Sequence, residues 1–218
     1  MIPIARPQLG PEEEAAVIEV MRSGALAQGA RVKAFEEAFA ATMGARYAVA
    51  TSNGTTALYL ALVAHGVGPG DEVITSPLTF IATANAIAQT GARPVLADID
   101  DSLNLNPAAA AELITNRTKA IVPVHLHGNP CDMPAFLQLA EEHGLALIQD
   151  ACQAVGARIA GSPLGTFGTA VYSLYATKNI TTGEGGMVIT NDLAIAQTCA
   201  SLRHQAYSSK PYVHEAIG

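Results

Sequence analysis

Short apolar segments rich in β-branched residues recur along most of the chain, and stretches with helical spacing separate the earlier ones. The predicted strands lie at residues 46–52, 71–77, 92–99, 119–128, 145–151, 169–178 and 185–191. The predicted helices between the first five lie at residues 54–66, 81–91, 107–115 and 133–144. Strict alternation of strand and helix is typical of βαβ crossovers. The pattern therefore predicts an α/β fold with a mostly parallel seven-stranded sheet and helices on both faces.

The two ends of this pattern differ from its centre. No clear helix separates the last three predicted strands, so we expect an antiparallel member there. Residues 11–24 have a proline and three glutamates in a first turn and a glycine as a stop, which predicts a helix outside the sheet. We divide the chain into an N-terminal helical segment (1–30), a large domain that contains the sheet (31–200) and the start of a connection that leads out of this domain (201–218).

Composition and charge restrict the partners of this fold. Half of the 218 residues are hydrophobic and only 14% are charged, which favours deep burial or a wide contact between subunits. The formal net charge is -7 and no cluster of Lys and Arg occurs, which argues against a nucleic-acid partner. The start "MIPIARPQLGPEEE" lacks the order of a secretory signal, and every apolar run is interrupted before membrane-spanning length. We expect a soluble, cytoplasmic oligomer.

Cysteine and histidine spacing gives little support for a metal centre. Cys131, Cys152 and Cys199 are widely spaced and odd in number, which predicts no disulfide framework and fits a reducing compartment. His125 and His127 in "HLH" share one side of a predicted strand and could both reach a metal. No further ligand motif accompanies them, so we expect no metal. His125 then either lines a pocket or packs structurally.

The first candidate site follows the first predicted strand, at the edge where open parallel sheets bind ligands. There, "SNGTT" leads directly into an apolar helix. Free backbone N–H groups and the positive end of the helix dipole can hold a phosphate beside Gly54 and Thr55. The alternative is that Ser52 or Asn53 only caps the helix.

Three more residues occupy comparable places after other strands. Phe80 follows the second strand, Asp150 closes the fifth, and Lys178 ends the sixth before a glycine-rich turn. Each also has an alternative role. Phe80 could be a core residue, Asp150 could cap a helix or form a structural ion pair, and Lys178 could be a solvated charge. Pyridoxal phosphate is held by four such parts: a phosphate-binding helix start, an aromatic ring, a buried carboxylate and a lysine at a strand end.

The order of these motifs resembles a known family. The segments "SNGTTAL", "GPGDEVITSPLTFIATANAI", "ARPVLADID", "VPVHLHG", "LIQDACQAVGA" and "YATKNITTGEGGMVIT" are similar to those of the DegT/DnrJ/EryC1/StrS family of pyridoxal-phosphate aminotransferases, which act on nucleotide-linked keto sugars. The resemblance runs almost to residue 215 and implies an aspartate-aminotransferase-like fold. It is most specific at the lysine followed by "TTGEGG".

The resemblance implies two catalytic residues. Lys178 would form the Schiff base with the cofactor and then move protons as general base and acid. Asp150 would keep the pyridine nitrogen protonated, so that the ring can act as an electron sink.

The resemblance also implies the residues that bind the cofactor. Gly54 and Thr55 would bind the phosphate at the helix start, and Ser173 would make a second phosphate contact. Phe80 would stack on the ring, and Gln153 would lie near the ring hydroxyl. His127 is assigned no role, because "VHLHG" departs from the usual form of the family.

The expected reaction is transfer of an amino group from an amino acid, usually glutamate in this family, to a nucleotide-linked keto sugar in a homodimer. The chain ends at "YVHEAIG" without a closing element, so it resembles a fragment that lacks a C-terminal small domain. Two alternatives remain open. One is a non-catalytic or regulatory cofactor-binding protein. The other is a nicotinamide-dependent oxidoreductase, which is disfavoured because no G-x-G-x-x-G follows the first strand.

Overall fold

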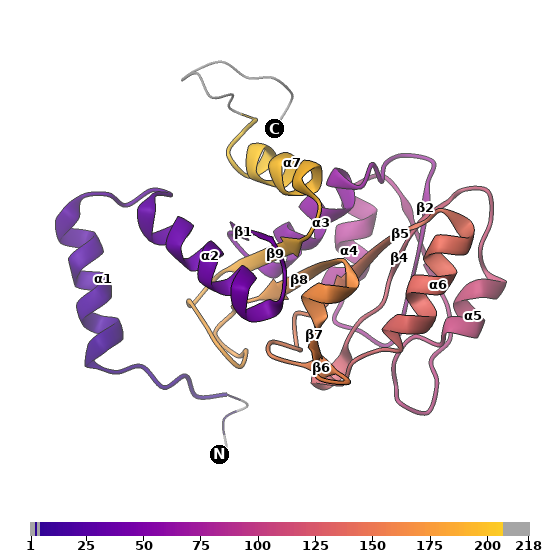
Figure 1. The fold of residues 1–218 in the computed structure, drawn as a ribbon, viewed down its shortest axis with the longest axis horizontal. Helices are drawn as coiled ribbons and strands as arrows, with labels where there is room; N and C mark the ends of the chain where they lie inside the picture. Colours follow the sequence, from indigo (N-terminus) through magenta and orange to yellow (C-terminus); the bar gives the residue numbers. More distant parts are fainter. Residues whose placement is uncertain (1–2, 4, 207–218) are drawn as a thin grey trace.

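Seven strands form one sheet in the computed structural model, which describes residue 3 and residues 5–206 (Figure 1). In chain order they are β1 (Tyr47–Thr51), β2 (Glu72–Thr75), β3 (Arg93–Leu96), β4 (Thr118–Val122), β5 (Ala146–Asp150), β8 (Thr169–Ser173) and β9 (Gly186–Thr190). Across the sheet the order is β1-β9-β8-β5-β4-β2-β3. Strand β9 is antiparallel to both neighbours, and every other adjacent pair is parallel. The predicted fold class, with an antiparallel member near the end, is therefore confirmed.

Helices cover both faces of this sheet, as the pattern predicts. One layer consists of α3 (Gly54–Ala64), α4 (Ala82–Gln89) and α7 (Leu193–Arg203). The opposite layer consists of α2 (Ala30–Met43), α5 (Pro107–Glu112) and α6 (Met133–His143). In β8, Val171 faces the first layer and Tyr172 the second, which is the alternation of a strand buried on both sides.

Three elements were not expected from the sequence. They are helix α2, helix α7 and the hairpin of β6 (Arg158–Ile159) and β7 (Ser162–Pro163). Apolar residues at helical spacing mark α2, because Phe39 and Met43 lie one turn apart and are both buried. The start of α7 is marked by Asp192, whose carboxylate accepts hydrogen bonds from the N–H groups of Ala194 and Ile195.

Two strands end earlier than the pattern predicts. Strand β4 stops at Val122, because Pro123 has no N–H to donate, and a 3-10 turn, η1 (Leu126–Gly128), follows. Strand β8 stops at Ser173, so the expectation that Lys178 ends this strand is wrong. The chain folds back instead, and Lys178 lies in a turn where its N–H donates to the carbonyl of Tyr175 at 2.9 Å.

Helix α1 (Pro11–Ser23) buries none of its residues and stands apart from the sheet (Figure 1). A helix outside the sheet is thus present, whereas the boundary at residue 30 stays a prediction. The expected connection over residues 201–218 overlaps the end of α7, and residues 207–218 lie outside the described part of the chain. Within residues 5–206, no helix is both long and apolar enough to span a bilayer.

A buried carboxylate ties the amino ends of three segments together. Glu72 at the start of β2 is 2% exposed, and its oxygens accept hydrogen bonds from Arg93 at 2.6 Å and from Thr115 at 2.7 Å. Arg117 completes an ion pair at 2.6 Å. The Arg93 hydrogen bond, with smaller contributions from Thr115 and Arg117, lowers the pKa of Glu72 to about 2.

We predict that Glu72→Gln lowers the melting temperature near neutral pH, because two guanidinium groups lose their shared anion. The folded pKa is depressed, so the stabilisation is present above the ordinary value of 4.5 and is lost as the pH falls from there towards 2. Thermal unfolding of both proteins between pH 7 and pH 3 measures this difference, which should shrink with acidification. The exposed Glu141→Gln is the matched control, and a constant difference at all pH values would contradict the prediction.

Candidate active site

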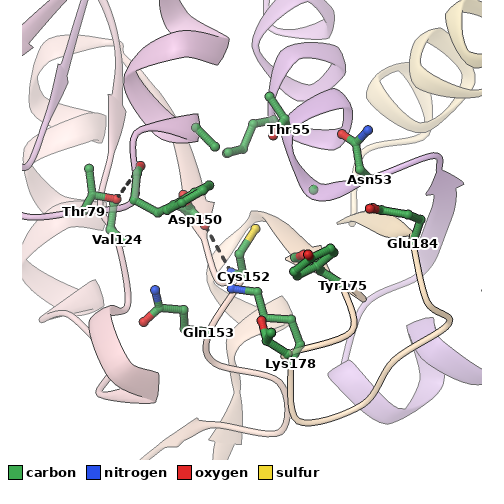
Figure 2. A pocket seen from close by; sticks show the side chains of 16 residues that line it. Asn53, Thr55, Thr79, Val124, Asp150, Cys152, Gln153, Tyr175, Lys178 and Glu184 are labelled. Carbon is green, nitrogen blue, oxygen red and sulfur yellow. Dashed lines mark hydrogen bonds between the residues drawn. The ribbon is translucent and has the colours of Figure 1, made fainter. Parts of the chain in front are cut away.

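A cavity of about 390 Å³ opens where β5 and β8 end, beside the first turn of α3. Figure 2 shows side chains from several segments of the chain converging on it, among them Thr55, Asp150 and Lys178. All the residues predicted from the sequence line this cavity: Gly54, Thr55, Phe80, Asp150, Gln153, Ser173 and Lys178. The topology therefore brings the predicted residues into one place, and their individual roles remain predictions.

The first turn of α3 combines a cap with free donors. The Asn53 side chain accepts a hydrogen bond from the N–H of Thr56 at 2.8 Å, so the capping interpretation is correct. The N–H groups of Gly54 and Thr55 have no helix carbonyl one turn before them to bond. They are therefore free to bind another partner. Capping and anion binding are thus compatible at this helix start, because they use different N–H groups.

Glycine is required for the close approach between this turn and the sheet. A Cβ on Gly54 would lie 2.9 Å from the Cβ of Ser173 and 3.1 Å from the sulfur of Cys152. A Cβ on Gly186 in β9 would lie only 2.4 Å from the carbonyl oxygen of Asn53. The 2.9 Å and 2.4 Å distances are shorter than real Cβ atoms show, so larger residues would push the helix start away from the cavity.

Asp150 presents a buried carboxylate at the end of β5, with 6% of its surface exposed. One carboxylate oxygen, Oδ2, accepts a hydrogen bond from the Thr83 hydroxyl at 2.7 Å, and the other, Oδ1, accepts one from the N–H of Cys152 at 3.1 Å. Gln153 is held by its own hydrogen bond, since its Oε1 accepts the N–H of His127 at 2.8 Å. Its NH₂ group remains as a donor at the cavity.

Lys178 is half-buried and reaches the cavity from the loop between β8 and β9. This loop closes on itself, because the hydroxyl of Thr181 and the N–H of Thr182 both donate to the carbonyl of Leu174, at 2.9 and 3.0 Å. The loop thus replaces a continued strand and still gives Lys178 a defined position. Figure 2 shows its side chain near those of Tyr175 and Cys152.

Cys152 lies between the two charged groups of the cavity. Burial raises the pKa of its thiol well above the usual value, and the Asp150 carboxylate raises it further, while the Lys178 charge opposes both. The thiol is therefore protonated at neutral pH. A protonated thiol is a poor nucleophile, so Cys152 is a weak candidate for covalent chemistry at this site.

Neither His125 nor His127 lines this cavity. His125 is fully buried and contacts Gln149 with Nε2 at 3.1 Å, while its Nδ1 accepts the N–H of Cys131 at 3.0 Å. Burial lowers the pKa of His125 to about 4, so the ring is neutral and packs structurally. His127 is exposed. The described residues contain no group of three or more His, Cys, Asp or Glu side chains placed to hold a metal.

Several lining residues are absent from the sequence-based site. Thr79, Cys152, Tyr175 and Glu184 all contribute to the cavity wall. The motifs offered a signal for two of them, since Cys152 lies between Asp150 and Gln153 and Glu184 lies within "TTGEGG".

Comparison with known proteins identifies relatives over nearly the whole chain. The spore coat polysaccharide biosynthesis protein SpsC of Bacillus subtilis is 51% identical over 197 residues, which cover 89% of this chain and 51% of SpsC. A pleiotropic regulatory protein of Geobacillus stearothermophilus is 46% identical over 215 residues, 97% of this chain and 57% of that protein. The chain therefore spans about half the length of the curated relatives that it matches.

The fold and the family agree with these relatives. The crystal structure of DesV from S. venezuelae, in complex with a ketimine intermediate, matches with a TM-score of 0.91 at 40% identity. The match covers 95% of this chain and 56% of DesV. Residues 7–218 match the family model described as the DegT/DnrJ/EryC1/StrS aminotransferase family. The resemblance read from the motifs is thereby confirmed, and the chain belongs to the DegT/DnrJ/EryC1/StrS aminotransferase family.

Proposed function

We propose that this protein is a pyridoxal-phosphate-dependent aminotransferase that moves an amino group from an amino acid, glutamate in the first instance, to a nucleotide-linked keto sugar. One observation carries the proposal. A single cavity combines the amine of Lys178, the buried carboxylate of Asp150 and the unpaired N–H groups at the start of α3. The sugar substrate is supported by the role of SpsC in polysaccharide biosynthesis.

Pyridoxal phosphate is the cofactor of this family, and the residues of the cavity fit its three polar ends. A phosphate needs N–H donors, which Gly54 and Thr55 have free, with the hydroxyl of Ser173 beside them. A protonated ring nitrogen needs an anion, which Asp150 provides. An aldehyde needs a primary amine, which Lys178 provides. When bound, the cofactor supplies an electron sink next to the substrate carbon.

The side chains of the chain itself then have distinct tasks. Asp150 holds a proton at the pyridine nitrogen, because a buried carboxylate stabilises an adjacent cation. The NH₂ group of Gln153 donates to the ring hydroxyl, and Phe80 covers one face of the ring. The amine of Lys178 takes the proton from the α-carbon of the donor and returns it at the cofactor's C4′ atom. The order is reversed when the keto sugar accepts the amino group.

The proposal extends to the assembly. Phe80 lines the cavity and is 68% exposed, and the next residue, Ile81, is 61% exposed, so the two side chains present an apolar surface beside the cavity. Lys178 is the only Lys or Arg among the lining residues that the structure describes, and it is accompanied by Asp150 and Glu184. The phosphates of a nucleotide sugar need more positive charge than this. We therefore infer a homodimer in which a second copy covers the cavity mouth.

The cell compartment and the domain division are part of the same proposal. Three free cysteines fit a reducing cytoplasm, where nucleotide sugars are made. In this proposal residues 31–200 form the cofactor-binding domain and residues 1–30 its N-terminal segment.

A regulatory role without catalysis is the second candidate, since one relative is described as a pleiotropic regulatory protein. The two candidates differ in one measurement. An aminotransferase changes the absorption spectrum of its bound cofactor when glutamate is added, whereas a binding protein without catalysis does not. An unchanged spectrum with cofactor bound would favour the regulatory role.

We predict that Lys178 carries the covalent link to the cofactor. Borohydride treatment of the protein saturated with pyridoxal phosphate, followed by digestion and mass spectrometry, should place the added mass on the peptide that contains Lys178. Lys178→Arg should lose the label and at least about 10²–10⁴-fold in kcat, the usual contribution of a general acid–base group. Lys119→Arg, at an exposed position, is the matched control. A label on Lys119 or Lys33 would refute the assignment.

We predict that Asp150→Asn folds normally but loses most of its transamination rate. The amide has nearly the same shape yet lacks the charge that stabilises the protonated ring, and loss of a buried charged hydrogen-bonded pair costs about 2–5 kcal/mol. Steady-state kinetics give this loss as a ratio of kcat/KM. Asp132→Asn is the control, because Asp132 caps α6 and an asparagine caps equally well. Near-normal turnover by Asp150→Asn would rule out the role.

We predict that the protein is a dimer by light scattering and that Ile81→Glu shifts it towards monomer. A charge at the centre of an apolar contact cannot be desolvated without a partner. Leu137→Glu on α6, which is exposed at the opposite layer, should leave the dimer intact. Equal behaviour of the two variants would place the contact elsewhere.

A further inference from the structure

Thr83 connects a helix to the carboxylate at the centre of the cavity. It lies in the first turn of α4, is 1% exposed, and donates a hydrogen bond from its hydroxyl to Asp150 Oδ2 at 2.7 Å. The two residues are 67 positions apart in the sequence. The other carboxylate oxygen is held by the N–H of Cys152 at 3.1 Å. Each oxygen of Asp150 therefore has a donor of its own.

The direction of the Thr83 hydrogen bond follows from its neighbours. Its hydroxyl oxygen lies 2.7 Å from the carboxylate of Asp150, 2.9 Å from the Thr79 hydroxyl and 3.3 Å from the carbonyl of Phe80. A hydroxyl has one proton, and the shortest contact is to the charged acceptor, so the proton goes to Asp150. The Thr79 hydroxyl then donates to Thr83. Two hydroxyl groups are thus aligned in series towards the carboxylate.

This arrangement differs from the usual one for a threonine within a helix. Such a hydroxyl commonly bonds a carbonyl in the preceding turn of its own helix, which stabilises nothing beyond the helix. Here the carbonyl of Phe80 is available, yet the contact is 0.6 Å longer than the contact to Asp150. The terminal torsion of an aspartate is soft, so a carboxylate with only the Cys152 N–H as partner could rotate. Two donors fix its plane.

We propose that Thr83 is a positioning residue for Asp150, which sets the orientation of the carboxylate towards the pyridine nitrogen. The inference rests on the proposed aminotransferase function. Thr83 contacts neither cofactor nor substrate in this scheme and acts through Asp150. Its hydroxyl is expected to affect both the affinity for the cofactor and the protonation of the ring nitrogen, because both depend on the orientation of the carboxylate.

The variants that test this are Thr83→Val, which keeps the shape and removes the hydroxyl, and Thr83→Ser, which keeps the hydroxyl. Thr75→Val is the matched control, because Thr75 is equally buried and its hydroxyl donates to the carbonyl of Val122 at 2.8 Å. For each protein we would measure the dissociation constant of pyridoxal phosphate, the ¹⁵N chemical shift of the labelled ring nitrogen, and kcat.

Thr83→Val should weaken cofactor binding and lower kcat about tenfold or more, and move the ¹⁵N shift towards the value of the unprotonated ring. Thr83→Ser should restore all three quantities to near the original values. Thr75→Val should lower the melting temperature and change none of the three. If Thr83→Val matched the original protein in shift and kcat, the inference would be overturned.

A double-mutant cycle with Asp150→Ala separates positioning from general destabilisation. If Thr83 acts through Asp150, then Thr83→Val should have no further effect on the dissociation constant once the carboxylate is absent. Equal effects in both backgrounds would assign Thr83 a merely structural role. If Thr83→Val does not fold, the same cycle with Thr83→Ala decides between the two outcomes.

Failure of the proposed function would look different. In that case the original protein would bind no pyridoxal phosphate or would show no spectral change with glutamate, whatever residue stood at position 83. If only the positioning inference is wrong, the original protein is fully active, and Thr83→Val and Thr83→Ser are indistinguishable from it.

Discussion

The close contact between the first turn of α3 and strands β8 and β9 determines the whole site. It depends on two glycines, since a side chain at Gly54 would strike Ser173 and one at Gly186 would strike the carbonyl of Asn53. Only with this contact do the free N–H groups of the helix start lie beside the ends of β5 and β8. The start of α3 and the carboxylate of Asp150 are then fixed relative to each other by backbone rather than by flexible side chains.

Burial of Asp150 would be unfavourable without the surrounding donors. A carboxylate removed from water must be compensated by hydrogen bonds or a cation. The structure gives it the Thr83 hydroxyl and the Cys152 N–H, and leaves its charge directed at the cavity. Packing of α4 against the sheet therefore orders this carboxylate as well as the core, because Thr83 lies on the same helix as the buried Ile87.

Much of the fold could be predicted because all seven sheet strands are apolar runs of ordinary length between turn residues. The extent of β8 could not, since the alternation in "YSLYATK" continues beyond Ser173, while backbone contacts of Leu174 with the following loop divert the chain. Each site residue was found from a short motif whose own residues are neighbours in sequence, such as Asp150 and Gln153 in "QDACQ". Thr83 was missed because its partner Asp150 lies far along the chain, and spacing carries no information about such pairs.

Cys152 is a thiol in the same cavity as Lys178 and Asp150, and the charges of both residues act on it. Thiolates add readily to aldehydes, so an ionised Cys152 would compete with the lysine amine for the cofactor. Burial is the largest effect on this thiol and Asp150 adds to it, and together they outweigh the opposing charge of Lys178, so that the pKa stays raised. Burial and the carboxylate of Asp150 thus keep the sulfur of Cys152 neutral, so that in the proposed mechanism the lysine amine meets no competing thiolate.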